Sequence, residues 1–190
     1  VWRYDPILLN NKYNKQYHYA MFEKYCRRLA ASTNKCVISF LDMYTKTKRN
    51  TKDLGLIDIQ PEDMYEIASM LANIAGRYGL YIETCSESID LSSLNIHKGK
   101  CIDDQMIEKI LGCPIKVKKD DTQREACGCV KSIDIGQYNT CRHFCAYCYA
   151  NYNHTQVIEA SESHNIHSPL LMGKLKGDET ITIREMKSVK

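Results

Sequence analysis

The chain has 190 residues, of which 26 are Lys or Arg and 23 are Asp or Glu, so its formal net charge is only +3. With 44% hydrophobic and 26% charged residues it has the composition of a folded globular protein, which excludes disorder of the whole chain. The charge is far from the basic excess of nucleic-acid-binding proteins, so it gives little reason to expect a nucleic-acid partner and does not exclude one. Ten cysteines stand out in a chain that is long enough to build a core without disulfides.

The sequence predicts a cytoplasmic protein that has no membrane partner. It contains no run of about 18 apolar residues that could span a bilayer, and its first residues, VWRYDPILL, lack the basic start and apolar stretch of a secretory signal. In a reducing compartment, clustered cysteines bind metal or carry out redox chemistry more often than they form cross-links.

Strands and helices alternate along the first 135 residues. A strand at 1–7 precedes an amphipathic helix whose apolar face includes His18, Phe22 and Leu29. A buried strand follows at 36–44, with the apolar run CVISFL, and then a basic polar loop at 46–52. A second helix begins at Pro61 and ends at Gly79, a third strand covers 80–84, a shorter helix runs from 102 to Gly112, and a fourth strand covers 130–135.

This alternation predicts an α/β fold with a parallel sheet and right-handed crossover helices. A complete (β/α) barrel needs about 250 residues, so we expect a partial TIM-like barrel at 1–135. Residues 136–190 would form a cysteine-rich cluster-binding segment and tail of the same domain, and the last 35 residues would be irregular apart from a short strand at 180–183. Because the chain opens inside a predicted strand, we expect that an upstream part is missing.

Three cysteines near the end of the predicted barrel, Cys141, Cys145 and Cys148, have the spacing C-x3-C-x2-C. Random placement of ten cysteines would give such a pattern about 0.03 times per chain of this length, so chance is a weak explanation. Three thiolates can each bind one iron of a 4Fe-4S cluster and leave the fourth iron open. A structural zinc site would need four closed ligands.

The spacing resembles that of the radical S-adenosylmethionine enzymes. In that superfamily the open iron binds S-adenosylmethionine, and one-electron reduction cleaves it to a 5'-deoxyadenosyl radical. The resemblance implies that Tyr147, just before the third cysteine, lies near the adenine. The stretch TCRHFCAYCYAN is also similar to the cysteine loop of enzymes like spore photoproduct lyase.

A second resemblance covers almost the whole chain. The segments WRYDPI, VISFLDMY, CIDD, QREACGC and SIDIGQYNTC, together with the cysteine loop, resemble the C-terminal part of domain-of-unknown-function family 1848. The resemblance implies a cysteine cluster near the C-terminus and a barrel-like fold, and it names no substrate or reaction.

The chain departs from the radical superfamily in two respects. The superfamily's cysteine loop follows the first strand of the barrel, whereas only 42 residues follow Cys148 here, and no Gly-Gly-Glu-type element follows the loop. A circularly permuted barrel, in which the strands that usually follow the cluster precede it, would explain both departures.

Four further cysteines lie near strand ends and predict a second site. Cys85 ends the third predicted strand, Cys101 begins a helix, and Cys127 and Cys129 precede the fourth predicted strand. These ends gather on one face of a parallel barrel, so the four thiolates could bind a second Fe-S cluster or a zinc ion. The alternative is four separate reduced thiols. Cys26 and Cys36 fit core positions, and Cys113 has no evident partner.

Barrel enzymes place their chemistry at the C-terminal ends of the strands, which makes Asp5 a candidate catalytic residue, although an Asp before Pro6 could instead shape a turn. The sequence therefore predicts a radical-type iron-sulfur enzyme with an unknown substrate and an electron donor such as ferredoxin or flavodoxin. The alternatives are an Fe-S protein with a structural or electron-transfer role and a zinc-binding module.

Overall fold

The computed structural model describes residues 1–175, 177–185, 188 and 189. They divide into two compact units. The first unit consists of residues 1–42 and 54–132 with Val189, and the second consists of residues 43–53 and 133–188 without the undescribed positions. No helix of the described part is both long and apolar enough to cross a membrane.

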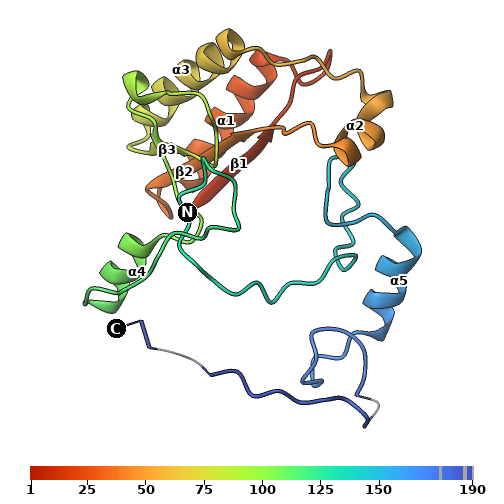
Figure 1. The fold of residues 1–190 in the computed structure, drawn as a ribbon. Helices are drawn as coiled ribbons and strands as arrows, with labels where there is room; N and C mark the ends of the chain where they lie inside the picture. Colours follow the sequence, from red (N-terminus) through yellow and green to blue (C-terminus); the bar gives the residue numbers. More distant parts are fainter. Residues whose placement is uncertain (176, 186–187, 190) are drawn as a thin grey trace. The chain divides into compact units, whose positions relative to one another are not determined.

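The first unit is built on a parallel sheet of four strands (Figure 1). The strands are β1 (Trp2–Ile7), β2 (Lys35–Phe40), β3 (Tyr81–Thr84) and β4 (His97–Lys98), and they lie side by side in the order of the sequence. Within the described residues the sheet is open, because β1 and β4 each pair on one side only. The predicted α/β fold with parallel strands and crossover helices is confirmed.

Helices α1 (Lys15–Leu29) and α3 (Pro61–Arg77) connect the first three strands. The side chain of Asn14 caps α1 by accepting the N–H of Tyr17, while α3 starts with Pro61 at its first turn. Past the end of α3, Gly79 has a φ of 67°, a left-handed conformation that glycine adopts without steric cost. The predicted limits of α3 are therefore close to the observed ones.

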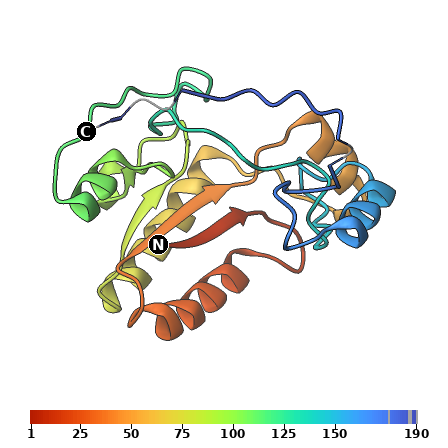
Figure 2. The same cartoon turned by 90° about the horizontal axis from the view of Figure 1, so that it is seen from below.

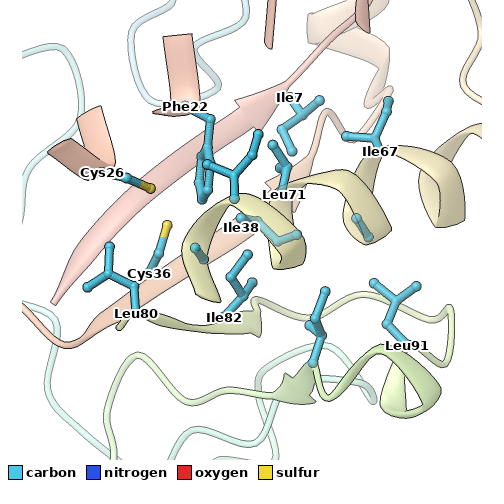
Figure 3. Close-up of a cluster of buried hydrophobic side chains, with 14 of the residues drawn as sticks. Ile7, Phe22, Cys26, Cys36, Ile38, Ile67, Leu71, Leu80, Ile82 and Leu91 are labelled. Carbon is cyan, nitrogen blue, oxygen red and sulfur yellow. The ribbon is translucent and has the colours of Figure 1, made fainter. Parts of the chain in front are cut away.

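The hydrophobic core lies between these two helices and one face of the sheet. Figure 3 shows Phe22 of α1 and Leu71 of α3 pointing toward Ile38 of β2. Cys26 and Cys36 lie in the same core with no exposed surface, so the prediction of packed core thiols is confirmed. Burial raises the pKa of Cys26 to about 11 and that of Cys36 to about 12, so both remain protonated thiols.

The opposite face of the sheet carries polar side chains. The strand register places Arg3, Val37, Glu83 and His97 in one row across all four strands, one residue out of phase with the row of Trp2, Cys36 and Ile82 that faces the core. Figure 2 shows α1 and α3 on the other side of the sheet from residues 99–132 of the same unit. Chemistry on this sheet is therefore separated from its hydrophobic core.

The prediction of a fourth strand at 130–135 is wrong. Val130 forms only an isolated antiparallel bridge with Lys119, and the next apolar residues, Ile133 and Ile135, are exposed. The side chain of Asp134 accepts the N–H of Gly136 at 2.7 Å and shapes a turn. The alternation of polar and apolar residues at 130–135 therefore does not reflect a strand. The fourth strand of the sheet is the two-residue β4.

Three other predictions also differ from the structure. The expected loop at 46–52 contains helix α2 (Thr45–Thr51), and the strand expected to reach residue 44 ends at Phe40. The C-terminal tail contains helix α5 (His154–Ser163) and no strand at 180–183. The remaining elements are the 3-10 turns η1 (Lys52–Leu54) and η2 (Ser92–Leu94) and helix α4 (Asp104–Leu111), whose C-terminal cap is Gly112 as predicted.

Candidate metal centre

Four cysteines of the first unit, called here the four-cysteine group, gather beyond the ends of β3 and β4: Cys85, Cys101, Cys127 and Cys129. Cys85 directly follows β3, and its N–H donates to the carbonyl of Ile38 at 3.0 Å, which extends the sheet by one residue. Cys101 follows β4 by three residues. Because parallel strands end at the same edge of a sheet, the two thiols meet, with their Sγ atoms 3.5 Å apart.

Backbone amides and neighbouring thiols hold Cys129 against this pair. Its Sγ accepts the N–H groups of Cys101 at 3.2 Å and Ile102 at 3.4 Å. Burial opposes ionisation of Cys129, yet these amides and the thiols of Cys127 and Cys101 outweigh it, so its pKa is lowered. Burial raises the pKa of Cys127, which lies beside Cys129. The four cysteines predicted as a second set therefore share one neighbourhood.

Arg3 reaches the group from β1. Its Nη1 donates to Sγ of Cys101 at 3.1 Å, and its Nη2 pairs with Oδ2 of Asp5 at 2.6 Å. Burial acts to lower the pKa of the guanidinium, but hydrogen bonds to Cys85 and Asp5 prevail and raise it. Burial, assisted by the neighbouring Cys85 thiol, raises the pKa of Cys101 to about 11. A fixed positive charge thus lies against two of the four sulfurs.

The structure places Asp5 within β1, ion-paired with Arg3. Both residues line a hollow of about 330 Å³ beside β1, together with Tyr4, His18 and Tyr25. Asp5 is thus positioned by Arg3 and reachable from a space large enough for a small molecule.

A buried ion group on the same face of the sheet escaped sequence analysis. The ammonium of Lys35, whose side chain is 3% exposed, lies 3.0 Å from Glu83 and 3.6 Å from Asp103. Burial acts to lower the pKa of Lys35, but the carboxylates of Glu83 and Asp103 prevail and raise it. A lysine at the start of a strand is usually exposed to solvent. The sequence signal for this pairing is Glu83, a carboxylate that lies between core residues on the next strand of the sheet.

The second unit holds the C-x3-C-x2-C motif on a loop that is closed at its base by Asn139. The N–H of Asn139 donates to the carbonyl of Ala150 at 3.0 Å. Its side-chain oxygen accepts the N–H groups of Tyr152 at 2.8 Å and Asn153 at 3.1 Å, and its amide donates to Gln156 at 2.8 Å. Residues 140–150 therefore project as one closed loop, called here the cysteine loop.

The three thiols of this loop are accessible. Cys141 and Cys145 are exposed and Cys148 is half-buried, with its N–H donating to the carbonyl of Cys145 at 2.9 Å. The amide of Asn151 donates to the carbonyl of Cys141. Tyr147, the residue expected near an adenine, is half-buried. The loop thus carries its donors on the outside, where a bound group could reach them.

An aromatic contact fixes one side of the loop. The ring of Phe144 stacks on that of His154, the first residue of α5, with centroids 4.0 Å apart and planes at 15°. Phe144 has a φ of 51°, which is unusual for a bulky residue. The stack therefore secures the turn between the first and second cysteines of the motif.

A family model described as a domain of unknown function (DUF1848) matches residues 1–150 of the chain. The chain belongs to the DUF1848 family. The match covers the whole sheet of this DUF1848 protein and all ten of its cysteines. No curated protein and no solved structure matches the sequence.

In the described part of this DUF1848 protein, no three His, Cys, Asp or Glu side chains already lie in an arrangement that could hold a metal ion. The cysteine loop offers three thiols without a fourth cysteine, and the four-cysteine group offers four from three separate segments. The two donor sets thus differ in number, and metal binding at either set would require the thiols to close around the metal.

Proposed function

We propose that the chain is an iron-sulfur protein of the radical S-adenosylmethionine type that acts on a substrate of unknown identity. Cys141, Cys145 and Cys148 would each bind one iron of a 4Fe-4S cluster. When bound, such a cluster supplies the electron for reductive cleavage of S-adenosylmethionine. The observation that carries the proposal is the closed, outward-facing loop that offers three thiols in the C-x3-C-x2-C spacing.

The donor chemistry of the loop fits this cofactor. Soft thiolate ligands suit iron-sulfur clusters, and a set of three leaves one iron available to a ligand that is not protein. No acidic residue lies between positions 140 and 150, so the loop offers no competing hard ligand. Asn139 would keep the ends of the loop together while the thiols close on the cluster.

Tyr147 would bind the adenine of S-adenosylmethionine by presenting its ring beside the third cysteine. Tyr147 is half-buried and is the residue before Cys148, so closure of the loop on the cluster would move its ring together with the Cys148 thiol. An electron donor such as ferredoxin or flavodoxin would approach the exposed side of the loop, at Cys141 and Cys145.

We further infer that the sheet belongs to a TIM-like (β/α) barrel. In a doubly wound fold the strand order reverses and helices cover both faces of the sheet. Here the four strands follow the order of the sequence, and α1 and α3 cover the same face. The polar row with Arg3 and Glu83 would then line the barrel interior, as expected for a permuted barrel that keeps its chemistry inside.

Within this arrangement we assign a catalytic role to Asp5. Its carboxylate is held by Arg3 and borders the hollow beside β1, so it could accept or return a proton at a substrate bound there. Removal of the carboxylate would lower substrate turnover without affecting iron binding.

The experiment that tests the proposal is anaerobic reconstitution with iron and sulfide, followed by reduction in the presence of S-adenosylmethionine. We expect release of 5'-deoxyadenosine, its loss in Cys145→Ser, and its retention in Cys113→Ser, where the replaced cysteine lies outside both donor sets. A reducible cluster without 5'-deoxyadenosine would favour an electron-transfer or structural role. Colourless protein that binds only zinc at this loop would contradict the proposal.

A further inference from the structure

We propose that the four-cysteine group is a separate structural zinc site that binds one zinc ion through Cys85, Cys101, Cys127 and Cys129. The site goes beyond the radical function proposed above, because it uses different residues in the other unit of the chain. Three features of the group favour zinc: the distance between the thiols, the groups that surround them and the segment that they would secure.

The distance between two of the sulfurs fits two thiolates that bind the same metal ion. Four thiolates that bind one zinc tetrahedrally at about 2.3 Å have neighbouring sulfurs about 3.8 Å apart. The observed separation of Cys85 and Cys101 is 3.5 Å, which is close to this value and far beyond the ~2.05 Å of a disulfide. In a 4Fe-4S cluster each thiolate binds a different iron, so the cysteine sulfurs lie farther apart; a 2Fe-2S cluster, in which two thiolates share one iron, is distinguished from zinc by its iron and sulfide.

The remaining two thiols are close enough to complete the set. Cys129 is held beside Cys101 by the amides of Cys101 and Ile102, and Cys127 lies beside Cys129. The Cys-x-Cys spacing allows side-chain rotation to bring both sulfurs toward one point. Occupation would thus require closure of Cys127 and Cys129 onto a pair that is already in place.

The surroundings fit the charge of such a site. Zinc with four thiolates has a formal charge of −2, and the guanidinium of Arg3 lies 3.1 Å from Sγ of Cys101. Amide N–H groups also donate to Cys129. Donors of this kind orient metal-bound sulfur and reduce its charge, so Arg3 would act as a positioning residue for the metal ligands.

The segment that contains the group has few buried apolar contacts to hold it. Between residues 99 and 132 the only regular element is α4, which has no buried residue, and the buried apolar positions in this stretch are Cys129 and Val130. A stretch of this length without a core of its own is typically secured by disulfides or metal. One ion bound by four cysteines would join the segment to the ends of β3 and β4.

The test uses the full chain with Cys141, Cys145 and Cys148 all changed to Ser, which removes the cysteine loop as a metal ligand. We expect about one zinc per chain by elemental analysis, with a first shell of sulfur only at about 2.3 Å by X-ray absorption. An added Cys101→Ser change should reduce the zinc content to background, whereas an added Cys113→Ser change should leave it unchanged. Arg3→Gln should weaken zinc binding about tenfold, measured by chelator competition.

Since Cys101→Ser could also impair folding, the absorption spectrum of the Co²⁺-loaded parent variant provides an independent measurement. Intense thiolate charge-transfer bands of tetrahedral Co²⁺ are expected. Iron with sulfide at these cysteines, a Cys85–Cys101 disulfide without metal, or four reduced thiols without metal would each overturn the proposal. None of these outcomes bears on 5'-deoxyadenosine production by the wild-type chain, so the two proposals can fail separately.

Discussion

Replacing Asn139 with alanine removes the side chain that closes the base of the cysteine loop. Three hydrogen bonds disappear: two that the Asn139 oxygen accepts from the N–H groups of Tyr152 and Asn153, and one that its Nδ2 donates to Oε1 of Gln156. At about 1 kcal/mol net for each bond, their loss costs about 3 kcal/mol. Asn139 also has a φ of 57°, and placing alanine in this left-handed conformation adds roughly 1 kcal/mol.

The total of about 4 kcal/mol corresponds to an increase of about 1,000-fold in local opening of the loop, since 1.4 kcal/mol is a factor of about ten. We expect the amides of Tyr152 and Asn153 to exchange with solvent much faster in Asn139→Ala, and iron per chain after reconstitution to fall. Asn139→Asp keeps the acceptor oxygen and should show a smaller change, while Asn165→Ala, which removes a single bond to the His167 amide, should leave the loop unaffected. Unchanged exchange at Tyr152 and Asn153 in Asn139→Ala would refute the reasoning.

Three further predictions concern the first unit. Burial lowers the pKa of His18, so just below pH ~6.5 the folded chain binds fewer protons than the unfolded chain. The contribution of His18 to stability is therefore full above that pH and declines as the pH falls toward the folded pKa. His18→Gln should remove this part of the pH dependence of the urea midpoint. Phe22→Ala deletes a fully buried ring and should lower the free energy of unfolding by about 3–5 kcal/mol; a loss below ~1 kcal/mol in urea titration would contradict the described core. Gly99→Ala would place a new Cβ against the carboxylate of Glu83 and 2.9 Å from its Cβ, so it should destabilise the fold by about 1–3 kcal/mol in the same titration. A neutral effect would show that Glu83 can move aside.

The elements predicted well are those whose own residues settle the structure. Helix α3 has Pro61 at its start, Gly79 past its end and an apolar stripe between them, so propensity, capping and burial agree. Strand β2 is buried at every position, and its apolar run has no other favourable environment. In both cases the local signal and the tertiary packing favour the same conformation.

The elements predicted wrongly depend on contacts that a local pattern does not contain. Helix α2 has no apolar stripe; its two buried residues are Thr47 and Thr51, joined by a hydrogen bond of 2.7 Å. Strand β4 has only two residues, both exposed, and it exists because the ladder from β3 continues through Gly99, whose N–H donates to Thr84. Such short or polar elements have no periodicity to detect.

The candidate sites show the same division. The approach of Cys85 to Cys101 could be predicted, because it follows from the rule that parallel strands end at one edge. The role of Asn139 could not, because its four hydrogen-bond partners lie 11 to 17 residues further along and are specified by loop conformation alone. Lys35 was also missed, because a buried lysine requires partners that only the assembled sheet supplies.

The distance along the chain between Arg3 and Cys101, 98 residues, has a consequence for biosynthesis. During translation, β1, β2 and β3 with α1 and α3 emerge first and can pack before Cys127 and Cys129 leave the ribosome. The four thiols can therefore assemble only at a late stage of translation. If the four-cysteine group binds zinc as proposed, growth with little available zinc should yield chains in which the early sheet is folded while residues 99–132 remain open to proteases. Limited proteolysis of such chains should then release a protected fragment that ends before Cys101.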